Sequence, residues 1–196
     1  MSITGILLAA GLSQRFGSNK LLQPLSDQTP MVVHCARRLK AVLSENVAVV
    51  GPDDATTAEL LSREGLQVVI NPHPDAGMGS SLACAIRAVH EASGWLVMLG
   101  DMPWIDKQTI RAVATELRQP RDIVAPLYGD RRGHPVGFGS AYVRDLIALD
   151  GDQGARAIVN ANPQHLTLVS VNDPGILRDV DYPEDLSSAE HQVPSS

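Results

Sequence analysis

Short apolar runs alternate with helical patterns along the first half of this 196-residue chain, and this alternation limits its fold most strongly. Each run is bounded by Gly, Pro or Asn, which is typical of buried strands. We predict strands over residues 3–9, 46–50, 66–70 and 95–99. Helical patterns fill the intervals, over residues 31–43, 55–64 and 79–92. Such an order predicts an α/β fold: a single-domain, Rossmann-like three-layer sandwich, with a mostly parallel sheet and helices on both faces.

The second half of the chain is less regular. Further strands are predicted over residues 123–126, 134–138 and 166–171, with a turn over 129–133. Helices are predicted over residues 107–117, 142–149 and 182–189. A further short helix is predicted to start within residues 151–156. Pro183 suits the first turn of the last helix. We expect one domain over residues 1–190 and a flexible tail over 191–196.

Composition excludes several classes of function. The net charge of −6 argues against nucleic acid as a partner, because such binding depends on Lys and Arg at phosphates. No apolar run reaches the ~20 residues that span a bilayer, and the N-terminal run lacks the positive region of a signal peptide. Cys35 and Cys84 lack the spacing of a zinc or redox site, so we expect both to be reduced and buried. These observations predict a cytoplasmic protein without a membrane partner.

The first apolar run ends at Gly11 in a loop of small residues that also contains Arg15 and Lys20. Free backbone N–H groups and two cations suit the binding of phosphates. The loop is not the P-loop of kinases, which needs G-x-x-x-x-G-K-[ST]; here Gly11 and Gly17 are six residues apart. A surface turn with two solvated cations remains the alternative.

Asp101 follows the apolar run 95–99, and Gly100 leaves space for a ligand beside it. Mg²⁺ favours one or two carboxylates together with substrate phosphates and water, so Asp101 is a candidate metal ligand. A cap of the turn before the next helix is the alternative. Asp179 and Asp181 alternate along a predicted short strand and would share a face, which makes either a candidate second carboxylate. Asp181 equally suits a helix N-terminus.

Two other segments carry polar groups at the expected edge of the sheet. After the third strand, Gly79 permits close backbone approach, and Ser80 and Ser81 offer hydroxyls at a helix N-terminus. Further on, Arg132 and His134 present a cation and an imidazole within a bent backbone. A capped loop and a structural histidine are the respective alternatives.

These segments together resemble the motifs of the molybdopterin nucleotidyltransferases. The resemblance extends from Ile6 to Leu186, and the motifs occur in the expected order, although Phe16 stands where Met is usual. The matching segments read LAAGLSQRFGSNK, GMGSSL, GDMP, GHPVGF, GDQGAR and DVDYPEDL. The resemblance implies a Mg²⁺-dependent enzyme that joins CTP to the phosphate of the molybdopterin cofactor. The products would be molybdopterin cytosine dinucleotide and pyrophosphate, and an apo-molybdoenzyme would be a possible recipient.

The resemblance also implies residue roles. Lys20, Arg15 and Asp101 would be catalytic, Asp101 and Asp181 would bind the metal, and His134, Pro135 and Arg156 would contact the acceptor. The expected nucleotide-binding residues are Leu8, Ala9, Ala10, Gly11, Ser13, Arg15, Lys20, Asn71, Gly79, Ser80 and Ser81. Residues 1–105 would form the nucleotide-binding half and residues 106–190 the acceptor-binding half.

Two departures from the guanylyltransferase branch favour cytosine over guanine. That branch usually has G-G where this chain has Ala10-Gly11, and G-P-L-A-G in place of GMGSSL. Three alternatives remain open: guanylyl transfer to the same cofactor, nucleotidyl transfer to a sugar or polyol phosphate, and a non-catalytic cofactor carrier for a molybdoenzyme. The combination of Arg15, Lys20 and Asp101 favours catalysis, because in-line transfer to an anionic phosphate needs charge neutralisation and no protein nucleophile.

Overall fold

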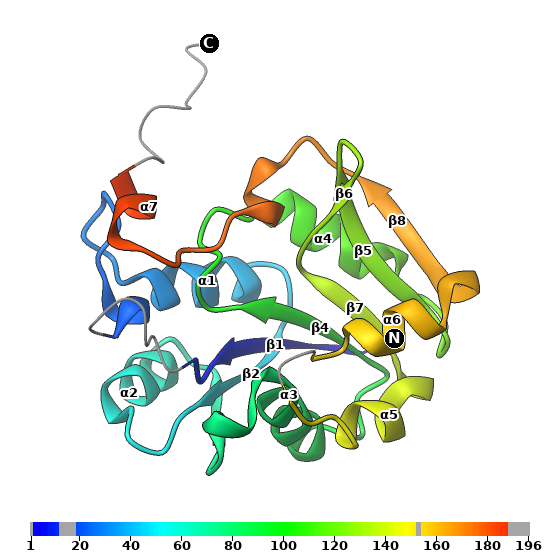
Figure 1. The fold of residues 1–196 in the computed structure, drawn as a ribbon, viewed down its shortest axis with the longest axis horizontal. Coiled ribbons are helices and arrows are strands. Elements are labelled where there is room, and N and C mark those ends of the chain that lie inside the picture. The colour runs from blue at the N-terminus through cyan, green and yellow to red at the C-terminus, as the bar shows by residue number, and fades with distance from the viewer. Residues whose placement is uncertain (1, 12–18, 152–153, 188–196) are drawn as a thin grey trace.

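A computed structural model describes residues 2–11, 19–151 and 154–187, and within them the strands form one eight-stranded sheet (Figure 1). The sheet is built from β1 (Ile3–Ala9), β2 (Glu45–Val50), β3 (Gln67–Ile70), β4 (Gly94–Leu99), β5 (Ile123–Tyr128), β6 (Arg131–Arg132), β7 (Val136–Gly139) and β8 (Leu166–Ser170). Their order is β3-β2-β1-β4-β7-β5-β6, and β8 pairs with β5 outside this path.

Most neighbouring strands are parallel, as the sequence predicts. Strands β3, β2, β1 and β4 pair in parallel, and β8 is parallel to β5. The exception is β7, which lies antiparallel between β4 and β5. Only residues 129–135 separate β5 from β7, too few for the crossover that a parallel pair requires. As a result β1, β4 and β5 run in the same direction, and their carboxyl ends lie on the same side of the sheet.

Helices cover both faces of the sheet, which confirms the three-layer architecture (Figure 1). Their bounds are α1 (Met31–Lys40), α2 (Ala55–Arg63), α3 (Met78–Ala88), α4 (Lys107–Glu116), α5 (Val143–Ile147), α6 (Arg156–Ala161) and α7 (Pro183–Ser187). Short 3₁₀ helices are η1 (Lys20–Leu22), η2 (Pro74–Ala76), η3 (Ser140–Tyr142), η4 (Pro163–His165) and η5 (Pro174–Leu177). Helices α1, α2 and α4 contribute to one apolar cluster, and α3, α5 and α6 to the other.

The second half of the central strand β1, Ile6 to Ala9, is continuously apolar because both faces of the strand are covered. Ile6 and Leu8 pack into the cluster beneath α3, and the intervening Leu7 packs into the cluster beneath α1. Because successive side chains of a strand point to opposite faces, a strand covered on both sides needs apolar residues at every position. The period-two pattern of a half-exposed strand is therefore absent from β1.

Four details of the prediction are wrong. Residues 178–181 do not form a strand, so Asp179 and Asp181 are not paired on one strand face. The turn predicted over 129–133 contains the short strand β6, paired with β5. Strand β3 lies at the sheet edge and is not buried, with Ile70 46% exposed. Cys35 is buried, but Cys84 is only partly buried.

The C-terminal segment is held against the start of α4 by a buried carboxylate. Asp173 accepts hydrogen bonds from the Asp106 backbone N–H at 2.8 Å, the Thr109 hydroxyl at 2.7 Å and the Gly175 backbone N–H at 2.9 Å. The first two donors lie at the start of α4, and the third lies in η5. Asp173 therefore fixes the segment that leads to Asp181.

Replacing Asp173 with Ala should lower the free energy of unfolding by about 2 kcal/mol or more, because two buried donors and one part-buried donor lose a charged acceptor. Urea denaturation followed by circular dichroism measures this loss. Asp106→Ala is the matched control, since the Asp106 side chain is exposed and makes no cap hydrogen bond. Equal stability of the two variants would contradict the anchoring role.

Candidate active site

The carboxyl ends of β1 and β4 meet directly before Asp101. The Gly100 N–H donates to the Leu8 carbonyl oxygen at 2.8 Å, which extends the pairing of the two strands by one residue. A Cβ atom at Gly100 would lie 3.1 Å from that oxygen, so a side chain would crowd the junction. The chain then turns, and Asp101 emerges at the sheet edge where ligands of parallel α/β sheets bind.

Helix α1 supports the loop that carries Asp101. The Cys35 thiol donates to the Gly100 carbonyl at 3.4 Å, and the Arg38 guanidinium donates to the Ile105 carbonyl at 2.6 Å. Burial raises the pKa of the Cys35 thiol, and the charge of Asp101 acts in the same direction. Cys35 is thus a neutral structural donor, as its burial predicts.

Lys20 reaches the same place from the other side. Asn19 caps η1 by accepting from the Leu21 N–H at 3.1 Å, while its amide nitrogen donates to Asp54 Oδ2 at 2.8 Å and Thr57 Oγ1 at 3.3 Å. Asp54 itself caps α2. Asn19 therefore locks the turn that carries Lys20 onto the start of α2.

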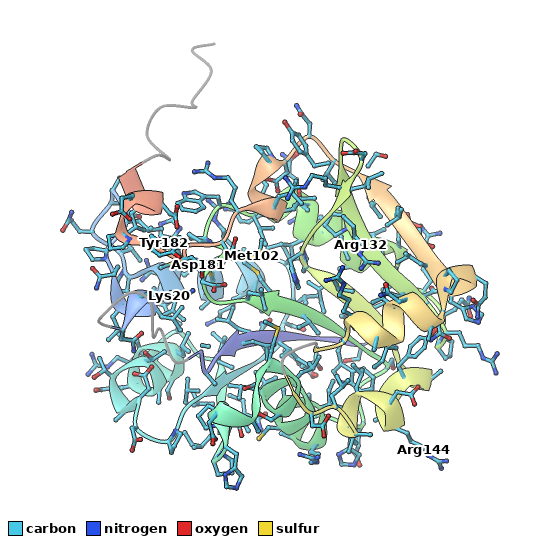
Figure 2. The ribbon with its side chains drawn as sticks, viewed as in Figure 1. Lys20, Met102, Arg132, Arg144, Asp181 and Tyr182 are labelled. Carbon is cyan, nitrogen blue, oxygen red and sulfur yellow. The ribbon has the colours of Figure 1, made fainter. Side chains whose placement is uncertain are left out.

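The Lys20 ammonium is the centre of the site. Its nitrogen lies 2.8 Å from Asp101 Oδ2 and 3.3 Å from Asp181 Oδ1, and it donates to the Val180 carbonyl at 2.8 Å. Figure 2 shows Lys20 and Asp181 next to each other, with Met102 close by. The sequence predicted that these three charged residues meet, but it gave no sign of the Val180 carbonyl.

Burial works to lower the pKa of Lys20, but the charges of Asp101 and Asp181 and their hydrogen bonds outweigh it. The pKa of Lys20 is therefore raised above its usual value. The ammonium stays protonated at neutral pH even though its side chain is only 11% exposed. A permanent positive charge at this position suits phosphate binding.

Asp101 has capacity for a further ligand. Its Oδ1 atom is buried and has no hydrogen-bond partner among the described residues. A buried carboxylate oxygen without a partner is costly, and a cation would satisfy it. Among those same residues no group of three or more His, Cys, Asp or Glu could hold a metal. Asp101 and Asp181 therefore fit an ion of the Mg²⁺ type, which takes its other ligands from phosphates and water.

The segment after β3 is fixed by its own hydrogen bonds. The Asn71 amide donates to Ser80 Oγ at 2.9 Å and Ser81 Oγ at 3.0 Å, and its oxygen accepts from the His73 N–H. Asn71 and Ser81 are buried, whereas Ser80 is half-buried. Their side chains fix the start of α3, but no side chain caps the helix, so the capped loop that was the alternative is not what the structure shows.

Gly79 connects this segment to the second half of the chain. Its N–H donates to the Gly151 carbonyl at 2.8 Å, and a Cβ at Gly79 would lie only 2.5 Å from the Asp150 oxygen. The glycine is therefore required for contact with the GDQGAR loop. Arg156, at the end of that loop, is exposed at the start of α6.

His134 and Pro135 lie on the β7 side of the site, before the strand and across a cis peptide bond. The His134 Nδ1 atom is buried without a hydrogen-bond partner among the described residues. Burial lowers the pKa of His134 and the charge of Arg132 adds to this, while a hydrogen bond with the Val97 backbone and the charges of Asp101 and Asp179 oppose it. Figure 2 shows Arg132 on the β5–β7 side of the molecule, across from Lys20.

Nothing in the sequence predicted the contact of Arg178 with Trp104. The Arg178 guanidinium carbon lies 4.5 Å from the Trp104 ring centroid, in a cation–π arrangement. Trp104 follows the GDMP motif, and Arg178 precedes Val180, so the contact joins the two segments that bear Asp101 and Asp181.

The other predicted residues divide into two groups. Leu8, Ala9 and Ala10 are buried, with their side chains in the two apolar clusters, so only their backbone could reach a ligand. Gly11 is exposed at the end of β1. Ser13, Arg15, Phe16 and Gly17 lie outside the described residues, as does the tail 191–196.

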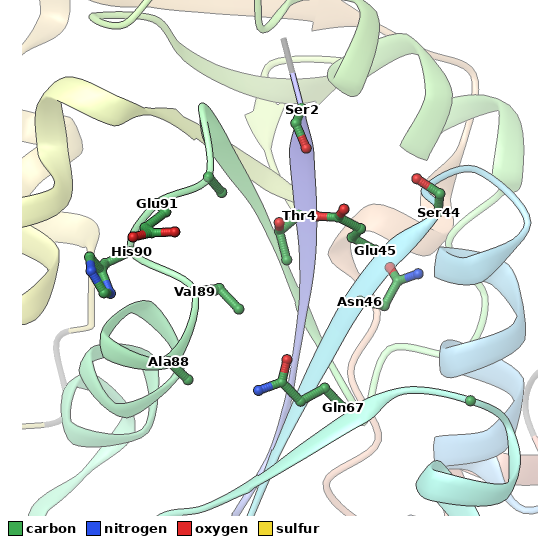
Figure 3. Close-up of a pocket in the computed structure, with 12 residues that line it drawn as sticks. Ser2, Thr4, Ser44, Glu45, Asn46, Gln67, Ala88, Val89, His90 and Glu91 are labelled. Carbon is green, nitrogen blue, oxygen red and sulfur yellow. The ribbon is translucent and has the colours of Figure 1, made fainter.

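A polar pocket of about 530 Å³ lies at the opposite, amino ends of the parallel strands. Figure 3 shows His90 and Glu91 on one side of it and Glu45 and Asn46 on the other. Two carboxylates and the C-terminal end of α3 disfavour an anionic ligand there. This pocket therefore does not suit a phosphate ligand. Within the described residues, no helix is both long and apolar enough to cross a membrane.

Comparison with known families agrees with this geometry. The model of the MobA-like NTP transferase domain matches residues 5–167. The chain belongs to this family. The match includes β1, Lys20, Asp101 and His134, and the resemblance to molybdopterin nucleotidyltransferases is confirmed. The chain is a nucleotidyltransferase.

Two similar proteins, one of them represented by two crystal structures, match nearly the whole chain. Nicotine blue oxidoreductase of Paenarthrobacter nicotinovorans is 30% identical over 194 residues, covering 94% of both chains. The crystal structure of Rv0371c from Mycobacterium tuberculosis H37Rv is 27% identical, with a TM-score of 0.83 over 96% of this chain and 97% of that one. A manganese complex of the same protein has a TM-score of 0.81 at 27% identity, over 98% and 100% of the two chains.

The lowered pKa of His134 predicts a pH-dependent stability. Between its native and unfolded pKa values the unfolded chain binds more protons, so the free energy of unfolding decreases as the pH falls below the unfolded value. Chemical denaturation at about pH 7.5 and about pH 5.5 should show a smaller loss in His134→Gln than in the wild type. An identical loss in both proteins would contradict a buried, neutral His134.

Proposed function

We propose that this chain transfers the cytidylyl group of CTP to the terminal phosphate of a molybdopterin-type cofactor, forming the cytosine dinucleotide and pyrophosphate. The observation that carries the proposal is the meeting of Lys20, Asp101 and Asp181 at the carboxyl ends of β1 and β4 in a MobA-like NTP transferase. We infer that residues 1–105 form the nucleotide-binding half and residues 106–190 the acceptor-binding half.

In the proposed reaction an oxygen of the acceptor phosphate attacks the α-phosphorus of CTP. The bond from the α-phosphorus to the bridging oxygen breaks, and that oxygen leaves with pyrophosphate. Because the acceptor is already an anion, no residue has to remove a proton or form a covalent intermediate. Catalysis then depends on positioning and on neutralising negative charge.

Lys20 would neutralise charge at the α-phosphate, and its raised pKa keeps it protonated for this role. Arg15 and the backbone N–H groups of residues 10–13 would bind the β- and γ-phosphates. Asp101 and Asp181 would hold Mg²⁺, consistent with the buried, unpartnered Oδ1 of Asp101. When bound, this ion would neutralise phosphate oxygens and assist the departure of pyrophosphate.

The acceptor would approach from the side of β7, where His134 is half-buried and Arg156 is exposed, while the buried Pro135 would shape the backbone beside them. The neutral His134 ring could exchange a hydrogen bond with the acceptor through Nδ1, which lacks a partner among the described residues. Contact of Gly79 with Gly151 links the nucleotide and acceptor sides, so the shape of one subsite depends on the other.

Cytosine is proposed as the base because of Ala10 and the GMGSSL segment. We propose that Ser80 and the backbone near Gly79 face the base and ribose, with Asn71 and Ser81 holding this segment in place. The manganese complex of Rv0371c supports use of a divalent metal by this chain. We further propose that the enzyme acts in the cytoplasm, where its cysteines stay reduced, and delivers its product to an apo-molybdoenzyme.

Release of pyrophosphate on mixing the protein with Mg²⁺, molybdopterin and each nucleoside triphosphate separately tests the proposal. Release with CTP and molybdopterin is expected. Preference for GTP would indicate the guanylyltransferase alternative. Activity only with sugar or polyol phosphates would show that molybdopterin is not the acceptor. Binding of pterin without nucleotide consumption would indicate a carrier. NTP-independent reduction of a dye would favour a redox activity such as that named for the Paenarthrobacter relative.

Lys20→Ala should lower kcat by about 100-fold or more while changing the affinity for CTP much less, because Lys20 acts mainly on charge at the α-phosphate. Steady-state kinetics and equilibrium binding of CTP separate the two effects. Lys107→Ala, at the exposed start of α4, is the control lysine variant. Unchanged turnover in Lys20→Ala would remove Lys20 from the mechanism.

A further inference from the structure

The oxygen atoms around the Lys20 ammonium form a donor set for a cation. Among the described residues they are Asp101 Oδ2, Asp181 Oδ1 and the Val180 carbonyl oxygen, at 2.8, 3.3 and 2.8 Å. Two carboxylates and a backbone carbonyl are the kinds of oxygen that also bind hard divalent ions. The positive charge of Lys20 therefore lies between the two carboxylates that the proposed function assigns to the metal.

An ammonium and a divalent ion cannot share these carboxylates at short range without strong repulsion. Two like charges a few ångströms apart repel each other strongly in a partly buried site, where the effective dielectric constant is well below that of water. Lys20 is 11% exposed and Asp101 21% exposed, so water screens this repulsion only in part. A metal could approach the unpartnered Oδ1 of Asp101, but binding both Asp101 and Asp181 requires Lys20 to leave them.

We propose that Lys20 is a resident counter-ion that blocks the metal site until a nucleotide triphosphate draws its ammonium away, so that metal and nucleotide bind cooperatively. This inference rests on the proposed function, since it takes Asp101 and Asp181 as the metal ligands. In the nucleotide-free enzyme the ammonium holds the two carboxylates together. In the complex, Lys20 pairs with phosphate, and the carboxylates become available.

The side chain and its setting suit this exchange. Asn19 fixes the backbone of Lys20 through Asp54 and Thr57, so a move of the ammonium needs only rotations of the flexible lysine stem. The Val180 N–H donates to the Asp101 carbonyl at 3.0 Å, so Val180 and Asp101 stay together when the ammonium leaves. The site is thus preformed and differs between the two states mainly in which cation occupies it.

Coupling of this kind is reciprocal. If nucleotide raises the affinity for metal, metal raises the affinity for nucleotide by the same factor. A metal ion then binds only weakly to the enzyme without nucleotide. The two carboxylates therefore bind a metal ion mainly when the nucleotide is also present. A purely structural ion pair, in contrast, would stay in place and leave metal affinity independent of Lys20.

Binding of Mn²⁺ in the absence of nucleotide tests the inference without reference to activity. Electron paramagnetic resonance titrations give the free Mn²⁺ concentration for the wild type, Lys20→Met, Asp101→Asn and the double variant. We expect Lys20→Met to bind Mn²⁺ about tenfold more tightly than the wild type, since the competing charge is gone. The double variant should lose this gain. Lys20→Gln provides a second neutral replacement, and Lys107→Met should behave as the wild type.

The same titrations with α,β-methylene CTP, which cannot transfer its nucleotidyl group, complete the test. Water-proton relaxation distinguishes Mn²⁺ bound to protein from Mn²⁺ on free nucleotide. The analogue should raise the Mn²⁺ affinity of the wild type and raise that of Lys20→Met much less. If Asp101→Asn weakens Mn²⁺ in the nucleotide complex but both Lys20 variants bind free Mn²⁺ no more tightly than the wild type, the counter-ion role is wrong and the metal site stands. If Asp101→Asn leaves Mn²⁺ affinity in that complex unchanged, the metal assignment of the proposed function fails.

Discussion

The contact of one ammonium with two carboxylates organises this molecule. Lys20 comes from the loop after β1, Asp101 from the loop after β4, and Asp181 from the segment after η5. Lys20 offsets the negative charges of Asp101 and Asp181 where these two carboxylates meet at the carboxyl ends of the strands. Breaking a partly buried pair by removing one partner is unfavourable because the other charge stays behind. The site therefore depends on all three segments being in place.

Much of the remaining structure holds these segments in position. Asn19 fastens the turn of Lys20 to α2, Cys35 supports Gly100 from α1, and Asp173 fastens the C-terminal segment to α4. Each anchor is a hydrogen bond between residues far apart in sequence. The transfer site is consequently a product of tertiary structure, and the helices contribute to it by supporting loops at the carboxyl edge of the sheet.

The alternation of apolar runs and helical patterns was sufficient to predict the three-layer fold, because buried parallel strands need continuous apolar sequence. The motifs predicted that Lys20 lies close to Asp101. Lys20 follows β1 and Asp101 follows β4, and these neighbouring parallel strands end at the same side of the sheet. The antiparallel direction of β7 was missed because it depends on the short connection from β5. The exposure of β3 was missed because it depends on the position of this strand at the end of the strand order. The Val180 carbonyl could not be predicted either, because a backbone acceptor leaves no mark in the sequence. The predicted strand of Asp179 and Asp181 was wrong since alternation over so few residues cannot distinguish a strand from a loop.

A crystal structure with α,β-methylene CTP and Mn²⁺ tests the central claim most directly, because anomalous scattering locates manganese without ambiguity. The account predicts manganese bound to Asp101, Asp181 and the triphosphate, with the Lys20 ammonium moved from the carboxylates to a phosphate. Manganese bound elsewhere, or Lys20 still between Asp101 and Asp181 beside a bound nucleotide, would contradict it.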